Sequence, residues 1–169
     1  MRPERPVPSS RKSRSGFTLP EALIAGTLLV IVIGSALMLY LAYGRVWRSA
    51  AVRMEADRQA TLAMNRMVYG IGTARGLRTA RAESVTLEPL AGGWRLSFAD
   101  YLNQTNRIEF DSAQRRLLLQ PGNRLIGANI TQASANISLT GAVLSVRATI
   151  REGLFNADST AGSAVRWRN

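Results

Sequence analysis

One acidic side chain lies at the start of a long apolar run near the N-terminus. Glu21 directly precedes apolar residues that extend from Ala22 to about Tyr43. A carboxylate in hydrocarbon is costly, about 2.5–3.5 kcal/mol at the centre of a membrane helix, so we expect Glu21 to have a partner and a function. The 169-residue chain has no Cys and no His. These absences exclude disulfides, thiolate catalysis, a lipoprotein anchor and Ser-His-Asp sites, and they remove the commonest metal ligand.

The apolar run predicts the element that positions Glu21. It has about the 20 residues that a helix needs to cross a bilayer. The segment before it is basic and Pro- and Ser-rich, and it should remain cytoplasmic by the positive-inside rule. Arg45, Arg48 and Arg53 follow the run on the other side, but the first segment usually sets the orientation. The leader's positive charges are Arg2, Arg5, Arg11, Lys12 and Arg14.

Residues 16–21 read Gly16-Phe17-Thr18-Leu19-Pro20-Glu21. This motif, after a short basic leader and before an apolar helix, resembles the processing site of type IV prepilins and type II secretion pseudopilins. The resemblance implies that a prepilin peptidase in the bacterial inner membrane cuts after Gly16, on the cytoplasmic side, and methylates the new N-terminal Phe17. It also implies that Glu21 helps the subunit enter a filament of other pilins or pseudopilins.

The chemistry implied by that cut is consistent with the positions of the residues. Cleavage after Gly16 creates an ammonium at Phe17, which needs an anion when it is buried among apolar helices. Glu21 lies one helical turn further along and could supply the anion to its own chain or to a neighbour. Pro20 replaces the aliphatic residue expected at its position. Its ring would crowd the Gly16 carbonyl in a helical precursor, so we hypothesise that it keeps the uncut Gly16–Phe17 bond open to the peptidase.

Two simpler interpretations account for part of this pattern. A secretory signal peptide also has a basic front and an apolar core, but that core has about 7–15 residues and ends at a small-residue cleavage site. A plain signal anchor explains the apolar helix but gives no reason for Glu21.

The helix is expected to continue beyond the membrane to about Ile71, because no Pro interrupts it and Gly70, Gly72 and Gly76 favour its end. Trp47 follows the apolar run and is interpreted as an anchor at the membrane interface. Gly34 is the only candidate weak point in the membrane segment. A helical stripe should pack on another element, and its predicted members are Val46, Ala50, Met54, Leu62, Met64, Met67, Val68 and Ile71.

The remainder of the chain alternates in short runs typical of strands. One face of the predicted sheet should be apolar, because the side chains of Trp94, Leu96 and Phe98 point to the same side, as do those of Ile108 and Phe110. This pattern predicts an antiparallel sheet with one face covered by the helix. The predicted strands are Ser84–Glu88, Trp94–Phe98, Arg107–Asp111, Arg115–Leu119, Asn136–Thr140, Val143–Arg151 and Val165–Trp167, separated by turns at Gly92-Gly93, Asp111-Ser112, Pro121-Gly122 and Thr140-Gly141.

The sequence thus predicts an α+β, pilin-like fold: a leader (1–16), a transmembrane helix (17–44), the extramembrane half of the helix with its connection (45–76) and a β-rich domain (77–169). The strands at 107–111 and 115–119 and the end of the chain at 164–169 also resemble, more weakly, minor pilins and J-type minor pseudopilins. The predicted protein is therefore a non-enzymatic minor pilin or pseudopilin with no cofactor, whose globular domain is extracytoplasmic.

Two further hypotheses concern ligands of the β-rich part. Arg75, Arg78 and Arg81 could contact DNA or anionic lipid, as in a DNA-uptake pilus subunit or a membrane-anchored binding module, or they could form a solvated loop. The leader accounts for five positive charges and Glu4, so the rest of the chain keeps +7 of the net +11. Oxygen atoms that could in principle hold calcium occur nearby, although such residues are usually turn formers. They belong to Asp100, Asn103, Asn106, Glu109 and Asp111.

Overall fold

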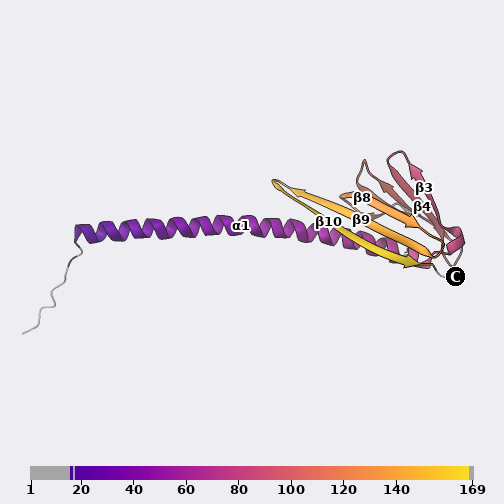
Figure 1. The fold of residues 1–169 in the computed structure, drawn as a ribbon, viewed down its shortest axis with the longest axis horizontal. Helices are drawn as coiled ribbons and strands as arrows, with labels where there is room; N and C mark the ends of the chain where they lie inside the picture. The colour runs from indigo at the N-terminus through magenta and orange to yellow at the C-terminus, as the bar shows by residue number, and fades with distance from the viewer. Residues whose placement is uncertain (1–15, 17, 168–169) are drawn as a thin grey trace, which may run out of the picture. The chain divides into compact units, whose positions relative to one another are not determined.

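The computed structural model describes residue 16 and residues 18–167 (Figure 1). It divides into two compact units, Met1–Gly44 and Arg45–Asn169. A single helix, α1 (Leu19–Tyr69), contributes residues to both.

In the second unit, α1 is followed by strands in three antiparallel sheets and by two short 3-10 turns. The helix ends at Tyr69, close to the predicted end at about Ile71, because Gly70 has a positive φ of 93° and begins a small hairpin. The elements after α1 are β1 (Gly70–Ile71), β2 (Ala74–Arg75), η1 (Leu77–Thr79), η2 (Ala82–Ser84), β3 (Thr86–Leu90), β4 (Gly93–Ala99), β5 (Thr105–Asp111), β6 (Arg116–Gln120), β7 (Arg124–Gly127), β8 (Ile130–Ile137), β9 (Gly141–Glu152) and β10 (Phe155–Arg166).

The five strands β3 to β7 form a meander in which each strand pairs with the next. The register places Trp94 opposite Phe110 and Leu96 opposite Ile108, and all four side chains are buried. The predicted alternation is therefore confirmed: one face of this sheet belongs to the core, as a half-covered antiparallel sheet requires. The Trp94 and Phe110 ring centroids lie 6.2 Å apart in a tilted arrangement.

A separate three-stranded sheet has the order β10-β9-β8. The prediction of one sheet was therefore wrong, because β8 pairs with β9 and not with the preceding meander. Strands β9 and β10 pair along twelve residues each, from Gly141 opposite Arg166 to Glu152 opposite Phe155. The predicted strand Val165–Trp167 overlaps only the last two residues of β10, which ends at Arg166. The predicted strand Asn136–Thr140 overlaps only the end of β8, and β7 was not predicted.

The stripe by which α1 packs on the sheets combines three alanines with two valines and two methionines. Its buried members recur every three or four positions, as one face of a helix does. The predicted members Val46 and Met54 are instead 65% and 71% exposed. The stripe is therefore shifted from the predicted one, and alanines in it let the strands approach the helix closely. Its buried residues are Val52, Ala56, Ala60, Ala63, Met64, Met67 and Val68.

Strand β10 runs along α1 in the same direction (Figure 1). Ala157 packs with Val52 and Ala56 near the start of β10, and the side chains of Val68 and Val165 belong to the main core near its end. From Val52 to Val68 the helix rises about 24 Å. From Ala157 to Val165 a strand rises about 26 Å, so the two elements remain in step along their contact.

Both sheets and α1 share one hydrophobic core. Leu77, Leu96, Leu117, Ile126 and Val146 are each fully buried in it. The β-rich part is thus held together by contacts between elements from 45 to 167, and α1 is the element on which both sheets pack. The α+β architecture predicted from the sequence is confirmed.

Candidate functional site

The predicted processing residues lie just before helix α1. Gly16 is exposed and outside any helix or strand, and Phe17 falls outside the described residues. The helix begins at Leu19, and the Ala22 N–H donates to the Thr18 carbonyl over 3.1 Å. Pro20 occupies the first turn, where an N–H would have no acceptor within the helix, so it is accommodated without a lost hydrogen bond.

Glu21 occupies the first turn of α1 and is exposed. Its charge is favourable at this helix end, since the free N–H groups there carry partial positive charge. Within the part of the chain that the structure describes, no cation pairs with it. The backbone thus explains why a carboxylate is tolerated at this position, and the carboxylate itself is free to meet a cation from elsewhere.

The apolar residues that follow Glu21 have no partner inside their own unit. Every described residue from 18 to 44 is exposed, and α1 is long and apolar enough there to cross a membrane by length and composition. Two hydroxyls in this run are satisfied locally: Thr27 donates to the Ile24 carbonyl over 2.8 Å and Ser35 to the Ile31 carbonyl over 2.7 Å. A segment of this kind is stable in lipid or against other apolar helices.

Ala22 and Gly26 are small residues four positions apart on α1, a spacing that lets helices approach closely in lipid. Ala22 and Gly26 line a shallow apolar hollow together with Leu23, Thr27, Val30 and Ile31. A side chain at Gly26 or Gly34 would meet nothing within 4 Å, and α1 is helical through both glycines. Gly34, the predicted weak point, therefore remains within the regular helix.

The basic connection after α1 is engaged within the chain. The Arg75 guanidinium pairs with Asp100 and lies 4.3 Å above the Tyr101 ring, and Arg81 donates to the Asn103 side chain over 2.7 Å. Arg78 lies over the Tyr69 ring at 5.4 Å. These contacts favour the structural interpretation of the three arginines over a free DNA-binding patch.

The oxygen-rich loop considered for calcium is likewise satisfied by protein groups. Asp100 is fully buried, and its Oδ1 accepts the backbone N–H groups of Leu102 and Gln104, each over 2.9 Å. Its Oδ2 faces the Arg75 Nε at 3.2 Å, close enough for an ion pair although outside hydrogen-bond geometry. Among the residues described, no cluster of three or more acidic side chains could hold a metal ion. The cation beside the Asp100 Oδ2 is the Arg75 guanidinium.

Several anchoring residues were missed by sequence reasoning. Arg66 of α1 donates to the Ile126 carbonyl over 2.9 Å, and Arg124 of β7 donates to the Ile71 carbonyl over 2.8 Å. Both arginines tie the outer strand of the meander to the helix end. An arginine, whether in a helix like Arg66 or in a strand like Arg124, indicates solvent exposure, so no local signal marked these two as structural.

The hairpin turn at Gly153-Leu154 was also missed. Gly153 has a φ of 57°, a conformation that glycine adopts without strain. A glycine after the alternating run Val143–Arg151 is a turn signal, and it could have indicated that a second strand follows.

No family model, curated protein or solved structure matches this chain. The chain has an α+β architecture, consistent with a pilin-like fold, with one long helix that is apolar enough near its N-terminus to cross a membrane by length and composition.

Proposed function

We propose that this chain is a minor pilin or pseudopilin, a structural and non-enzymatic subunit of a type IV pilus-like or type II secretion filament. The observation that carries the proposal is the motif Gly16 to Glu21 placed directly before an apolar helix. The α+β architecture, with α1 packed on antiparallel sheets, supports it because a filament subunit needs a stalk and a globular part.

Processing is the first step of the proposed function. A prepilin peptidase in the bacterial inner membrane cuts between Gly16 and Phe17 on the cytoplasmic side and methylates the Phe17 nitrogen. The exposed, non-helical backbone at Gly16 supports this step, because a peptidase needs access to the bond that it cuts. The globular unit then lies on the extracytoplasmic side of the membrane.

Assembly is the second step. The apolar residues 22–43 can exchange lipid for the helices of neighbouring subunits, and the small residues at 22 and 26 allow close approach. Burial of the Phe17 ammonium requires an anion, which Glu21 supplies within its own chain or to the next subunit. Repeated head-to-tail contacts of this type do not close on themselves, so they build a filament.

Intact-mass measurement of the protein purified from membranes tests the processing step. In cells that contain the peptidase, the mass should correspond to loss of Met1–Gly16 and addition of one methyl group. Gly16→Ala should slow the cut and Gly16→Val should abolish it, because side chains there obstruct close approach of the peptidase.

Gly26→Ala is the matched control, since a side chain at Gly26 also meets nothing within 4 Å but lies inside α1. It should be processed like the unchanged chain. An uncut wild-type chain in the presence of an active peptidase would contradict the proposed function.

A further inference from the structure

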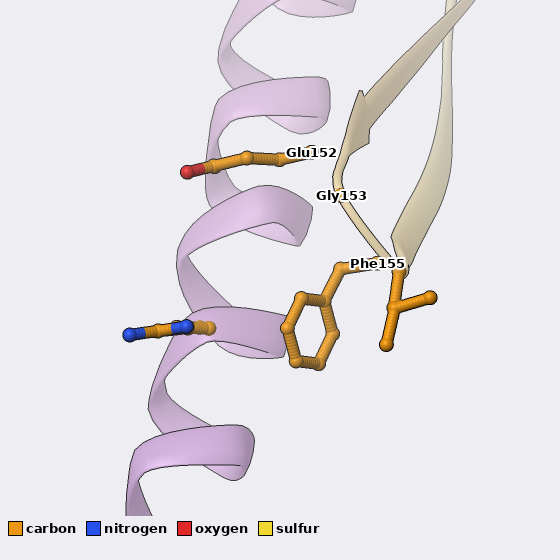
Figure 2. Close-up of a pocket in the computed structure, with 5 residues that line it drawn as sticks. Glu152, Gly153 and Phe155 are labelled. Atoms are coloured by element: carbon orange, nitrogen blue, oxygen red, sulfur yellow. The ribbon is translucent and has the colours of Figure 1, made fainter.

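The tip of the β9–β10 hairpin is held firmly against α1. Phe155 and Ile150 pack on a small cluster formed by Val52, Ala56 and Ala157. In Figure 2 the Phe155 ring points toward the helix, and the Glu152 side chain extends across the helix. The turn at Gly153 is therefore fixed in place at the level of the first helical turns of its unit.

The most exposed apolar side chain of the described residues lies at this tip. Leu154 is 100% exposed, although strands β9 and β10 are otherwise paired and packed. Together with Arg48, Glu152, Gly153 and Phe155, it lines a shallow hollow beside α1. Leu154 therefore presents an apolar side chain to the surroundings, next to Phe155, which packs against the helix cluster.

The sequence of the helix indicates what lies next to this tip. Arg45, Trp47 and Arg48 come directly after the apolar run 22–43, and all three are exposed. If that run spans the hydrocarbon core, these three residues are at the level of the lipid headgroups, where Trp and Arg are favoured. Because the hairpin tip lies beside Arg48, it reaches the same level.

We propose that the β9–β10 tip is a second membrane contact of this protein. Leu154 inserts at the boundary between headgroups and acyl chains on the extracytoplasmic surface, and Arg48 and Arg151 approach lipid phosphates. The charges are complementary to an anionic surface, since the exposed Arg45, Arg48 and Arg151 outnumber Glu152 at this end. The inference rests on the membrane span in the proposed function.

This contact would give the globular unit a defined attachment to the bilayer before assembly. A single apolar helix lets the attached domain rotate and tilt, whereas a second contact on a packed hairpin restricts both motions. Amphipathic surfaces bind at this depth through apolar insertion combined with attraction to anionic lipid. Entry into a filament would then require release of Leu154 from the membrane.

The absence of Cys allows the contact to be measured at single sites. The full chain carrying Leu154→Cys is labelled with the polarity-sensitive fluorophore NBD and reconstituted at low density into vesicles that contain phosphatidylglycerol. The control is Leu139→Cys, which is 96% exposed in the β8–β9 turn. The two sites are at opposite ends of β9, whose twelve residues span about 40 Å. A third label at Leu28→Cys reports the membrane span.

We expect the label at 154 to show blue-shifted emission and loss of intensity with lipids brominated near the headgroup, and the label at 139 to show neither. In the Arg48→Gln/Arg151→Gln background the quenching at 154 should fall. A label at 154 that behaves like the label at 139, while Leu28→Cys is quenched by deeply brominated lipid, would overturn the tip contact and leave the membrane span intact.

Two further outcomes would also overturn the inference. A blue shift at 154 without quenching by brominated lipid would show that the label lies against this protein itself instead of the bilayer. A label at 28 that is not quenched would remove the membrane span, and with it both the tip contact and the proposed function.

Discussion

The Arg75 Nε lies 3.2 Å from the Oδ2 of the fully buried Asp100, and this ion pair joins the connection after α1 to the loop that follows β4. Arg75 is one-third exposed, and its guanidinium also lies over the Tyr101 ring. Asp100 is therefore a buried charge whose compensation comes from one partly exposed arginine and from the backbone of its own loop.

Removal of Arg75 should destabilise the globular unit. Arg75→Leu leaves the Asp100 carboxylate buried without a counter-charge, which costs about 3–5 kcal/mol in fully buried pairs; we expect the low end here because water reaches Arg75. Denaturant unfolding followed by fluorescence of the buried Trp94 and Trp167 measures the change. Asp100→Asn in the Arg75→Leu background should restore part of the stability, and a double variant that is less stable than Arg75→Leu would contradict this account.

The close contact between β7 and α1 gives a second stability prediction. A Cβ on Gly127 would lie 2.8 Å from the Ala63 Cβ and 3.2 Å from the Ile130 side chain. Gly127→Ala should therefore destabilise by about 1–3 kcal/mol through overpacking, and Ala63→Gly should recover part of the loss. Gly162→Ala is the control, because its Cβ would meet only the Leu144 carbonyl oxygen at an ordinary 3.5 Å. Equal stability of Gly127→Ala and the unchanged chain would show that the interface has room.

The parts of the fold that were predicted correctly depend on local patterns. Large side chains alternate in β4 and β5, so the buried face containing Trp94 and Ile108 was visible in the sequence. Strand β10 shows no such pattern: its residues are mostly small or polar, and it is a strand because it pairs with β9 over its full length. Pairing between distant segments is decided by the tertiary structure and leaves little trace in a single sequence.

The helical stripe was misplaced for a related reason. Val46 and Met54 have more apolar surface than Ala56 and Ala60, yet the alanines are buried and the larger residues are exposed. The buried face of α1 depends on where the strands lie: Ala63 faces Gly127 of β7, where a Cβ on the glycine would be only 2.8 Å from the Ala63 Cβ. Which side chains fit between a helix and a strand cannot be predicted from the sequence before both elements are placed. The residues of the candidate processing site, by contrast, could be identified because they form one contiguous motif.

Pro20 should affect the rate of processing. In Pro20→Leu the helix can extend toward Gly16, because no ring crowds the Gly16 carbonyl, so the bond after Gly16 becomes less accessible. We expect slower conversion to the mature mass in a time course with the peptidase. Ile24→Leu, an apolar exchange further along α1, should be cut at the normal rate. A Pro20→Leu chain that is cut as fast as the unchanged one would contradict the role given to this proline.

Glu21 should be required for assembly and dispensable for insertion and cleavage. Glu21→Val leaves the leader, Gly16 and the apolar run unchanged, so the variant should reach the membrane and mature normally. Filament entry then buries the Phe17 ammonium without an anion, a penalty of several kcal/mol. Pull-down with partner subunits, at equal levels of mature protein in the membrane, should therefore recover much less of Glu21→Val than of the unchanged chain.

The charge-retaining Glu21→Asp separates this role from a contribution to the helix end. Either carboxylate interacts favourably with the first turn of α1, but the shorter Asp side chain reaches less far toward an ammonium. If the pull-down recovers Glu21→Asp at a level between those of Glu21→Val and the unchanged chain, a carboxylate must meet the Phe17 nitrogen. Equal recovery of all three chains would mean that Glu21 only stabilises the start of the helix, and the assembly role proposed for it would have to be abandoned.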